Sequence, residues 1–111
     1  MDKNQSDTIA KKIYFITGSR IKQLRTEKHI SQKSFAFKLG LTRTSISNIE
    51  HGRQKILLDT LWRIADILKV DIVELIPKSD EVDSAFEGIF PRDTSKKEKD
   101  WIIAEFIEEK V

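Results

Sequence analysis

Cysteine is absent from this 111-residue sequence, and glycine and proline are scarce, with four and two residues. Without cysteine the chain can form no disulfide and offers no thiolate to a metal ion. Its two histidines are not accompanied by Asp or Glu at metal-ligand spacing, so we expect no metal site and no cofactor. Nucleophile–base pairs, phosphate-cradling glycine loops and HExxH-type spacings are also missing, which argues against an enzyme.

Long apolar runs are missing as well, since none extends beyond a few residues. A membrane-spanning helix needs about 20 apolar residues, so no segment is predicted to cross a membrane. The first residues, MDKNQSDT, lack the basic stretch followed by an apolar stretch that marks a signal peptide. These absences together predict a cytoplasmic protein.

The charges that are present divide unevenly along the chain, although the net charge is only +2. Residues 11–63 contain 12 Lys or Arg and 3 Asp or Glu, whereas residues 64–111 contain 7 and 13. A basic half beside an acidic half is typical of a protein with one face that binds a polyanion. The alternative is a chance segregation of charges on a solvated surface.

Apolar residues recur at helical spacing over residues 8–28 and predict a first helix. The positions are Ile9, Ile13, Ile16, Ile21 and Leu24. Gly18 interrupts the pattern, which leaves open one bent helix or two separate helices. Residues 1–7 are polar, and we expect them to lack fixed structure.

Two short helices joined by a glycine turn are predicted over residues 31–53, SQKSFAFKLGLTRTSISNIEHGR. Ser31 is a good N-cap for a helix over 32–39, whose residues Phe35, Ala36 and Leu39 point inward. Gly40 ends that helix in the left-handed conformation that glycine adopts readily. Thr42 then caps a helix over 43–50, with Ile46 and Ile49 buried.

The rest of the chain continues the helical pattern without any strand-like alternation, so the fold class is all-α. A fourth helix is predicted over 58–69 and a short fifth over 72–76, which begins with the capping-box pair Asp71 and Glu74. A last helix over 95–110 begins with Ser95 and Glu98 and carries an apolar stripe. The predicted organisation is a flexible N-terminal tail, a domain of five helices, an acidic linker and a C-terminal helix, over residues 1–10, 11–77, 78–94 and 95–111.

The helix predicted over 43–50 has an unusual composition, because Ser, Thr and Asn form helices poorly. It begins with small hydrogen-bonding side chains around one arginine: Thr42, Arg43, Thr44, Ser45, Ser47 and Asn48. Such side chains suit a helix that enters the DNA major groove. There Arg43 can donate two hydrogen bonds to guanine, and Asn48 can pair with adenine.

Residues 19–77 resemble the Cro/phage-repressor (Xre) class of helix-turn-helix domains. The matching positions are Arg25, Ser31, Gln32, Ala36, Gly40, Thr42, Ile46, Ser47, Ile49, Glu50, Gly52 and the block 58–76. The resemblance implies a five-helix fold, to which this chain adds a C-terminal helix.

The resemblance also implies roles for single residues. The residues that would read bases are Arg43, Thr44, Ser47 and Asn48. The residues that would bind phosphates are Gln32, Ser45, Arg53 and Lys55, and Gln32 would also brace the recognition helix. Arg25 and Glu50 would form a structural salt bridge. Ser47 has an alternative, a hydrogen bond back to a carbonyl of its own helix.

As a whole, this class implies a transcriptional regulator that binds a near-palindromic operator in double-stranded DNA as a homodimer, with residues 58–76 as the dimer contact. The run RTSIS at 43–47, followed by IEHGRQ, further resembles the controller proteins of restriction–modification systems. An alternative is an antitoxin-like or phage repressor-like protein whose C-terminal helix binds a protein partner. A third is a structural domain that binds no DNA.

Overall fold

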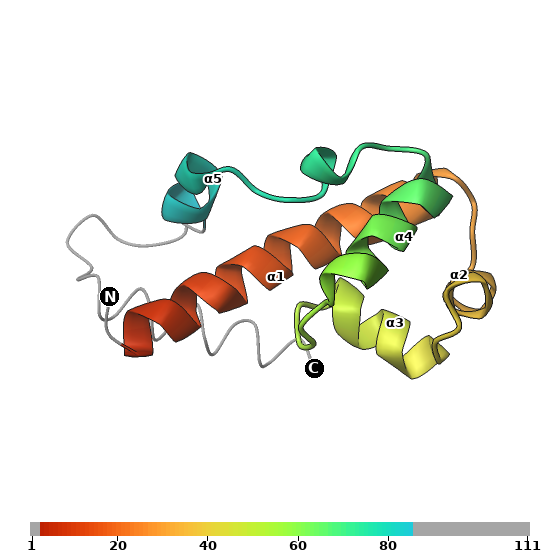
Figure 1. Ribbon diagram of the computed structural model, residues 1–111, viewed down its shortest axis with the longest axis horizontal. Helices are drawn as coiled ribbons and strands as arrows, with labels where there is room; N and C mark the ends of the chain where they lie inside the picture. The colour runs from red at the N-terminus through yellow and green to blue at the C-terminus, as the bar shows by residue number, and fades with distance from the viewer. Residues whose placement is uncertain (1–2, 86–111) are drawn as a thin grey trace.

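The computed structural model describes residues 3–85, which form five α-helices and one 3-10 helix and contain no strand (Figure 1). The elements are α1 Lys3–Glu27, α2 Gln32–Leu39, α3 Arg43–Glu50, α4 Leu58–Leu68, η1 Ile72–Glu74 and α5 Ser79–Ser84. The long helix α1 packs against α3 and α4, and α2 packs against α3 and α4 in turn, while α5 lies beside the N-terminal half of α1. The predicted C-terminal helix lies outside the described residues.

The core lies where α1, α2, α3 and α4 meet, and η1 closes it. The largest fully buried side chains are Phe35, Ile21, Ile46, Ile49, Ile64, Leu68 and Leu75. Burying each of these side chains stabilises the fold by about 1.5–3 kcal/mol relative to exposure. Of the inward positions predicted from spacing, Ile9, Ile13, Ile16 and Leu24 of α1 are only half-buried, whereas those of the next two helices and Ile21 are buried.

The turn between α2 and α3 has the predicted caps and the predicted glycine conformation. The Ser31 hydroxyl accepts a hydrogen bond of 3.0 Å from the amide of Ser34, and the Thr42 hydroxyl accepts one of 3.0 Å from the amide of Ser45. Gly40 lies between the helices with φ of 68°, a backbone conformation that costs other residues free energy. The chain therefore stops α2 and starts α3 within three residues.

The first helix runs without a break through Gly18, so the single-helix possibility is the right one. A Cβ atom at this position would lie 2.1 Å from the carbonyl oxygen of Ile49. Glycine is therefore needed here for the close approach of α1 to the C-terminal end of α3, and not for a turn. The sequence pattern alone does not distinguish these two uses of glycine.

Several helix boundaries differ from the prediction: α1 spans residues 3–27 instead of 8–28, and α4 ends at Leu68 instead of residue 69. Helix α1 begins at Lys3, although residues 3–7 were expected to lack fixed structure. The segment contains no glycine or proline, so a helix formed further along propagates backwards at one hydrogen bond per residue. The predicted helix over 72–76 is a 3-10 turn, Ile72–Glu74, because Pro77 disfavours the helical conformation of the residue before it.

Helix α5 lies in the segment that was predicted to be linker. The Glu81 carboxylate accepts a hydrogen bond of 3.0 Å from the amide of Lys78 and pairs with the Arg20 guanidinium of α1. The hydrogen bond from the Lys78 amide lowers the pKa of Glu81 from its usual value. Partial desolvation opposes this shift, and the pairing with Arg20 adds to it. Val82 is buried. These tertiary contacts hold α5 on α1, whereas the division of the chain into domains stays a prediction.

Candidate nucleic-acid interface

Helix α3 has one buried face and one open face. Ile46, Ile49 and Glu50 are buried, whereas Arg43 and Thr44 are exposed and Ser47 and Asn48 are half-buried. Residues three and four positions apart share a helix face. The four side chains that are not buried, those of Arg43, Thr44, Ser47 and Asn48, therefore form one surface on the open side. The four residues predicted to read bases therefore lie together.

An open depression adjoins this surface, which we call the α3 depression. It is lined by Gln32, Arg43, Thr44, Ser47, Asn48 and Arg53. The structure thus brings all four predicted base-reading residues together with two of the four predicted phosphate-binding residues. Every side chain in the set carries a hydrogen-bonding group, and two carry a full positive charge.

Beneath the α3 depression lies the predicted pair of Arg25 and Glu50. Arg25 donates from Nε to Glu50 Oε2 at 2.6 Å and from a terminal nitrogen to Oε1 at 3.1 Å. Its other terminal nitrogen donates to the Ile30 carbonyl at 2.6 Å. Glu50 is 3% exposed, so this two-bond pairing compensates for the loss of its hydration.

Gln32 connects the buried pair to the open surface. Its side-chain nitrogen donates to Glu50 Oε1 at 3.1 Å, and its side-chain oxygen accepts a longer bond of 3.4 Å from Arg43 Nε. Arg43 is thereby held at the first position of α3 by a chain of contacts that begins at Arg25 in α1. Such support holds a binding side chain in place before its ligand arrives.

Arg53 follows α3 in the loop that leads to α4 and reaches back to the open surface. One of its terminal nitrogens donates to Asn48 Oδ1 at 3.2 Å. The Asn48 amide nitrogen still has its two hydrogens, which are the donors that an adenine edge accepts. The contact places a cation next to a side chain predicted to read bases.

The two remaining predicted phosphate-binding residues, Ser45 and Lys55, do not line the α3 depression. The amide of Ser45 donates to the Thr42 hydroxyl in the N-cap. Lys55 is exposed in the loop between α3 and α4. No contact in the structure assigns either residue a role, so both roles stay predictions.

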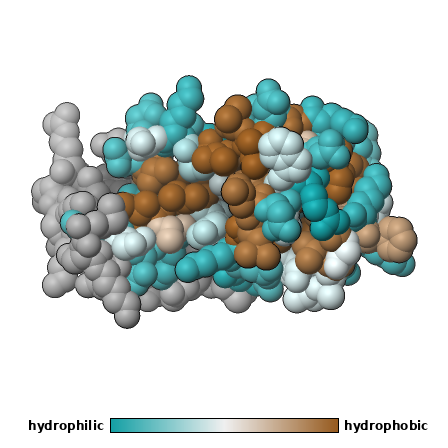
Figure 2. Space-filling model, in the orientation of Figure 1, coloured by the Kyte–Doolittle hydropathy of each residue, from teal (hydrophilic) through white to brown (hydrophobic). Residues whose placement is uncertain are grey.

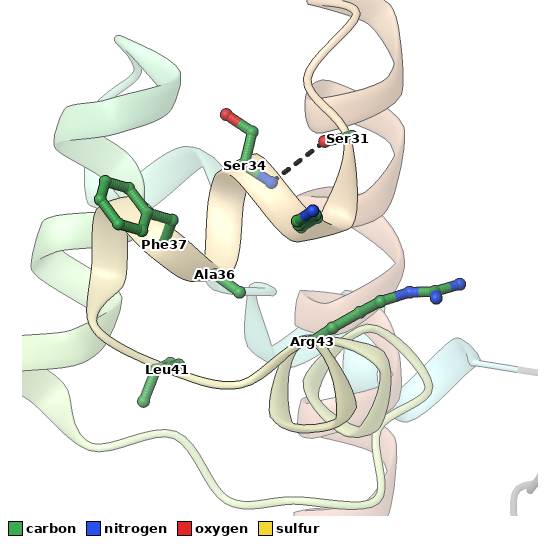
Figure 3. Close-up of a pocket in the computed structure, with 7 residues that line it drawn as sticks. Ser31, Ser34, Ala36, Phe37, Leu41 and Arg43 are labelled. Atoms are coloured by element: carbon green, nitrogen blue, oxygen red, sulfur yellow. Dashed lines mark hydrogen bonds between the residues drawn. The ribbon is translucent and has the colours of Figure 1, made fainter.

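A second depression lies between α2 and the start of α3, and sequence reasoning missed it. We call it the α2 depression (Figure 3); its lining residues are Ser31, Lys33, Ser34, Ala36, Phe37, Leu41 and Arg43. Phe37 is 87% exposed. The signal was present in the sequence, because Phe37 lies off the inward stripe formed by its neighbours Phe35, Ala36 and Leu39.

A third surface is apolar and lies away from these depressions. Figure 2 shows apolar side chains gathered around the start of α4 and η1. The large exposed apolar residues of this region are Leu57, Leu58, Trp62, Val73 and Ile76. We call them the α4–η1 surface. It lies within and beside residues 58–76, the range predicted to form a dimer contact.

Within residues 3–85, no group of three or more His, Asp or Glu side chains is placed to hold a metal ion. Nor does this part of the chain contain a helix whose length and apolar character would allow it to cross a membrane. The surfaces described above present hydrogen-bonding groups, cations and apolar side chains. These are the groups with which proteins bind nucleic acids and other proteins.

Comparison with known proteins identifies relatives of the same architecture. The helix-turn-helix family profile matches residues 21–75. The ImmF control region 10 kDa protein of Bacillus phage phi105 is 40% identical over 75 residues, which cover 68% of this chain and 81% of that protein. Control protein C.MunI of a Mycoplasma species is 41% identical over 59 residues, covering 52% of this chain and 80% of that protein.

A solved structure shows the same similarity. The restriction-modification controller protein C.AhdI from Aeromonas hydrophila superposes with a TM-score of 0.51 and 30% sequence identity. The superposition covers 63% of this chain and 97% of that chain. The profile match over residues 21–75 leaves out α5 and the first turns of α1.

Proposed function

Because this chain belongs to the helix-turn-helix family of DNA-binding transcriptional regulators, we propose that it binds a near-palindromic operator as a homodimer. The observation that carries the proposal is the α3 depression. It combines four polar side chains of one helix face, one of which is the braced cation Arg43, with Arg53 from the following loop. Two such helices, one from each protomer, would enter the major groove about 34 Å apart.

Within each half-site, the side chains of α3 carry the sequence preference. Arg43 donates to guanine O6 and N7, and Asn48 donates to N7 of adenine and accepts from its amino group. Thr44 and Ser47 add hydroxyl contacts to neighbouring base edges. Because Gln32 holds Arg43 from behind, less side-chain entropy is lost when Arg43 binds a base.

Phosphate contacts supply affinity and register. Gln32 uses one hydrogen of its side-chain nitrogen for Glu50, and the other is available for a phosphate at the edge of the groove. Arg53, Lys55 and Ser45 bind phosphates on either side of the recognition helix. These contacts do not depend on base sequence, and those made by cations weaken as the salt concentration rises.

The homodimer forms through the α4–η1 surface. Trp62 is 66% exposed and Val73 is 70% exposed. Both line a depression whose other lining residues are the apolar Ala65, Val70 and Ile72 and the acidic Asp66 and Asp71. Large apolar side chains gathered on one surface mark a protein contact site. A two-fold axis through this surface would present both α3 helices to one side of a DNA duplex.

The finer assignment is to the controller proteins of restriction–modification systems. The names of C.MunI and C.AhdI support it, whereas the phage phi105 relative comes from a phage control region. The two assignments share one DNA-binding mechanism and differ in the genes controlled. A gene for a restriction endonuclease or methyltransferase next to this one would support the controller assignment, and a phage immunity region in its place would contradict it.

The test begins with selection of the preferred site from random duplex DNA. Arg43→Ala is then compared with the unchanged protein on the selected site and on a scrambled site. We expect the selected site to lose about 1–3 kcal/mol of binding free energy and the scrambled site to lose much less. Equal losses on both sites would show that Arg43 reads no base.

Arg53→Ala is the matched control, because it removes a cation from the same depression. It should weaken binding to both sites and reduce the slope of log K against log salt by about 1. Failure to select any preferred site would contradict the proposed function as a whole.

A further inference from the structure

The α2 depression has a composition that the base-reading mechanism leaves unused. Its apolar part consists of Ala36, Phe37 and Leu41, and its exposed cation, Lys33, comes from the first turn of α2. In Figure 3 the Phe37 ring and the Arg43 side chain extend from opposite sides of this hollow. A single exposed phenylalanine is unremarkable, but here it adjoins two further apolar side chains and two cations.

The α2 depression is continuous with the α3 depression, because Arg43 lines both. The two depressions therefore form adjoining parts of one surface. In helix-turn-helix complexes the helix before the recognition helix crosses the duplex backbone. That backbone alternates anionic phosphates with the apolar carbon face of deoxyribose, which matches cations placed around an apolar floor.

We propose that the α2 depression is a backbone clamp that binds one sugar–phosphate unit beside the base-reading contacts, with deoxyribose against Phe37 and Leu41 and the phosphate at Lys33. The proposal rests on the proposed function, since it requires DNA at α3. It adds an apolar contact to an interface that is otherwise polar and charged. Because every nucleotide has the same sugar, the clamp adds affinity without adding sequence preference.

Salt dependence separates the two halves of the clamp. A cation that neutralises a phosphate releases counterions, whereas an apolar contact releases none. Lys33→Ala should therefore lower the slope of log K against log salt by about 1. Phe37→Ala should weaken binding about fivefold to tenfold through lost apolar burial, equally on selected and scrambled sites, and should leave the slope unchanged.

Two control variants accompany these measurements. Lys38→Ala removes an exposed cation of α2 that does not line the depression, and it should change neither affinity nor slope. Phe37→Leu keeps an apolar side chain and should recover most of the lost affinity. Thermal unfolding of each variant shows whether the fold is intact, and the exposure of Phe37 leads us to expect little change in Tm.

A set of duplexes, each lacking one nucleotide in the strand that flanks the half-site, locates the sugar. A gap at one position should weaken DNA binding by the unchanged protein. The same gap should leave DNA binding by Phe37→Ala unaffected, because that variant has already lost the contact. Unchanged DNA affinity in Phe37→Ala would overturn the proposal and favour a protein partner at this surface. A loss confined to the selected site would overturn it too, because Phe37 would then read a base.

These outcomes are separable from a failure of the proposed function. If Arg43→Ala abolishes sequence preference while Phe37→Ala binds normally, the regulator assignment holds and the clamp does not exist. If neither variant affects DNA binding, both proposals are wrong.

Discussion

At the scale of single residues, Glu50 connects the buried ion pair to the open surface of α3. Its buried carboxylate accepts hydrogen bonds from Arg25 and from Gln32, and Gln32 in turn contacts Arg43. A buried ion pair adds little net stability, because desolvation offsets the attraction between the charges. Its value here is positional, since one carboxylate holds side chains from α1 and α2 against the start of α3.

Glu50→Ala should destabilise the protein by about 3–5 kcal/mol, because it leaves the Arg25 guanidinium buried without its counter-charge. Denaturant unfolding followed by circular dichroism measures the change. The double variant Arg25→Met/Glu50→Leu removes both charges and should recover much of the lost stability.

DNA binding gives an independent readout of the same pair. The double variant should fold but lose sequence preference, because Gln32 no longer has the Glu50 carboxylate to hold it. Full recovery of site preference in this variant would contradict the positional role of the pair.

At the scale of elements, the contact of α1 with α3 depends on Gly18. In an exposed helix interior, replacing glycine by alanine stabilises a protein by about 1 kcal/mol. Here the added methyl group would meet the carbonyl oxygens of Ile49 and Glu50, which belong to the backbone and cannot rotate away. The two effects oppose each other, and steric overlap with the backbone is the larger.

Gly18→Ala should therefore destabilise the protein, by about 1–3 kcal/mol, instead of stabilising it. Thermal unfolding measures the change in Tm, whose sign shows whether the variant is less or more stable than the unchanged protein. Ser19→Ala is a suitable control, since Ser19 is the next residue of α1 and is exposed. A rise in Tm for Gly18→Ala would show that α1 and α3 can separate at little cost.

At the scale of the whole molecule, the surfaces proposed to contact DNA and a second protomer are formed by different residues. The α3 and α2 depressions share Arg43, whereas the α4–η1 surface contains no residue of either. A dimer through that surface leaves both depressions free. Linking two half-site contacts in one dimer raises affinity for a full operator far above that for one half-site.

Replacing Trp62 by aspartate should weaken the dimer at least tenfold, because aromatic side chains near the centre of an interface contribute most of its energy. Sedimentation velocity over a range of protein concentrations measures the dissociation constant. Phe37→Asp is the matched control, because Phe37 is also a large exposed aromatic residue but lies outside the α4–η1 surface. An unchanged dimer in Trp62→Asp would place the protomer contact elsewhere.

Much of the fold follows from local patterns. The boundaries of α2 and α3 were predicted residue for residue, because Ser31, Gly40 and Thr42 act through hydrogen bonds and backbone angles within a few positions. Inward stripes followed from helical spacing. Helix α5 was not predicted, because it depends on the pairing of Glu81 with Arg20, which lies 61 residues away.

The composition and spacing of the sequence alone determined an all-α helix-turn-helix domain and the four polar side chains on one face of α3, because caps and helix periodicity are local properties. Tertiary structure decided what depends on distant segments meeting. It made Gly18 a contact with α3 instead of a break between two helices, connected Arg43 through Gln32 to a buried carboxylate, and left Phe37 exposed beside the start of α3. The physical reason is that helix spacing assigns a side chain to a face, whereas only the packing of helices decides what that face meets.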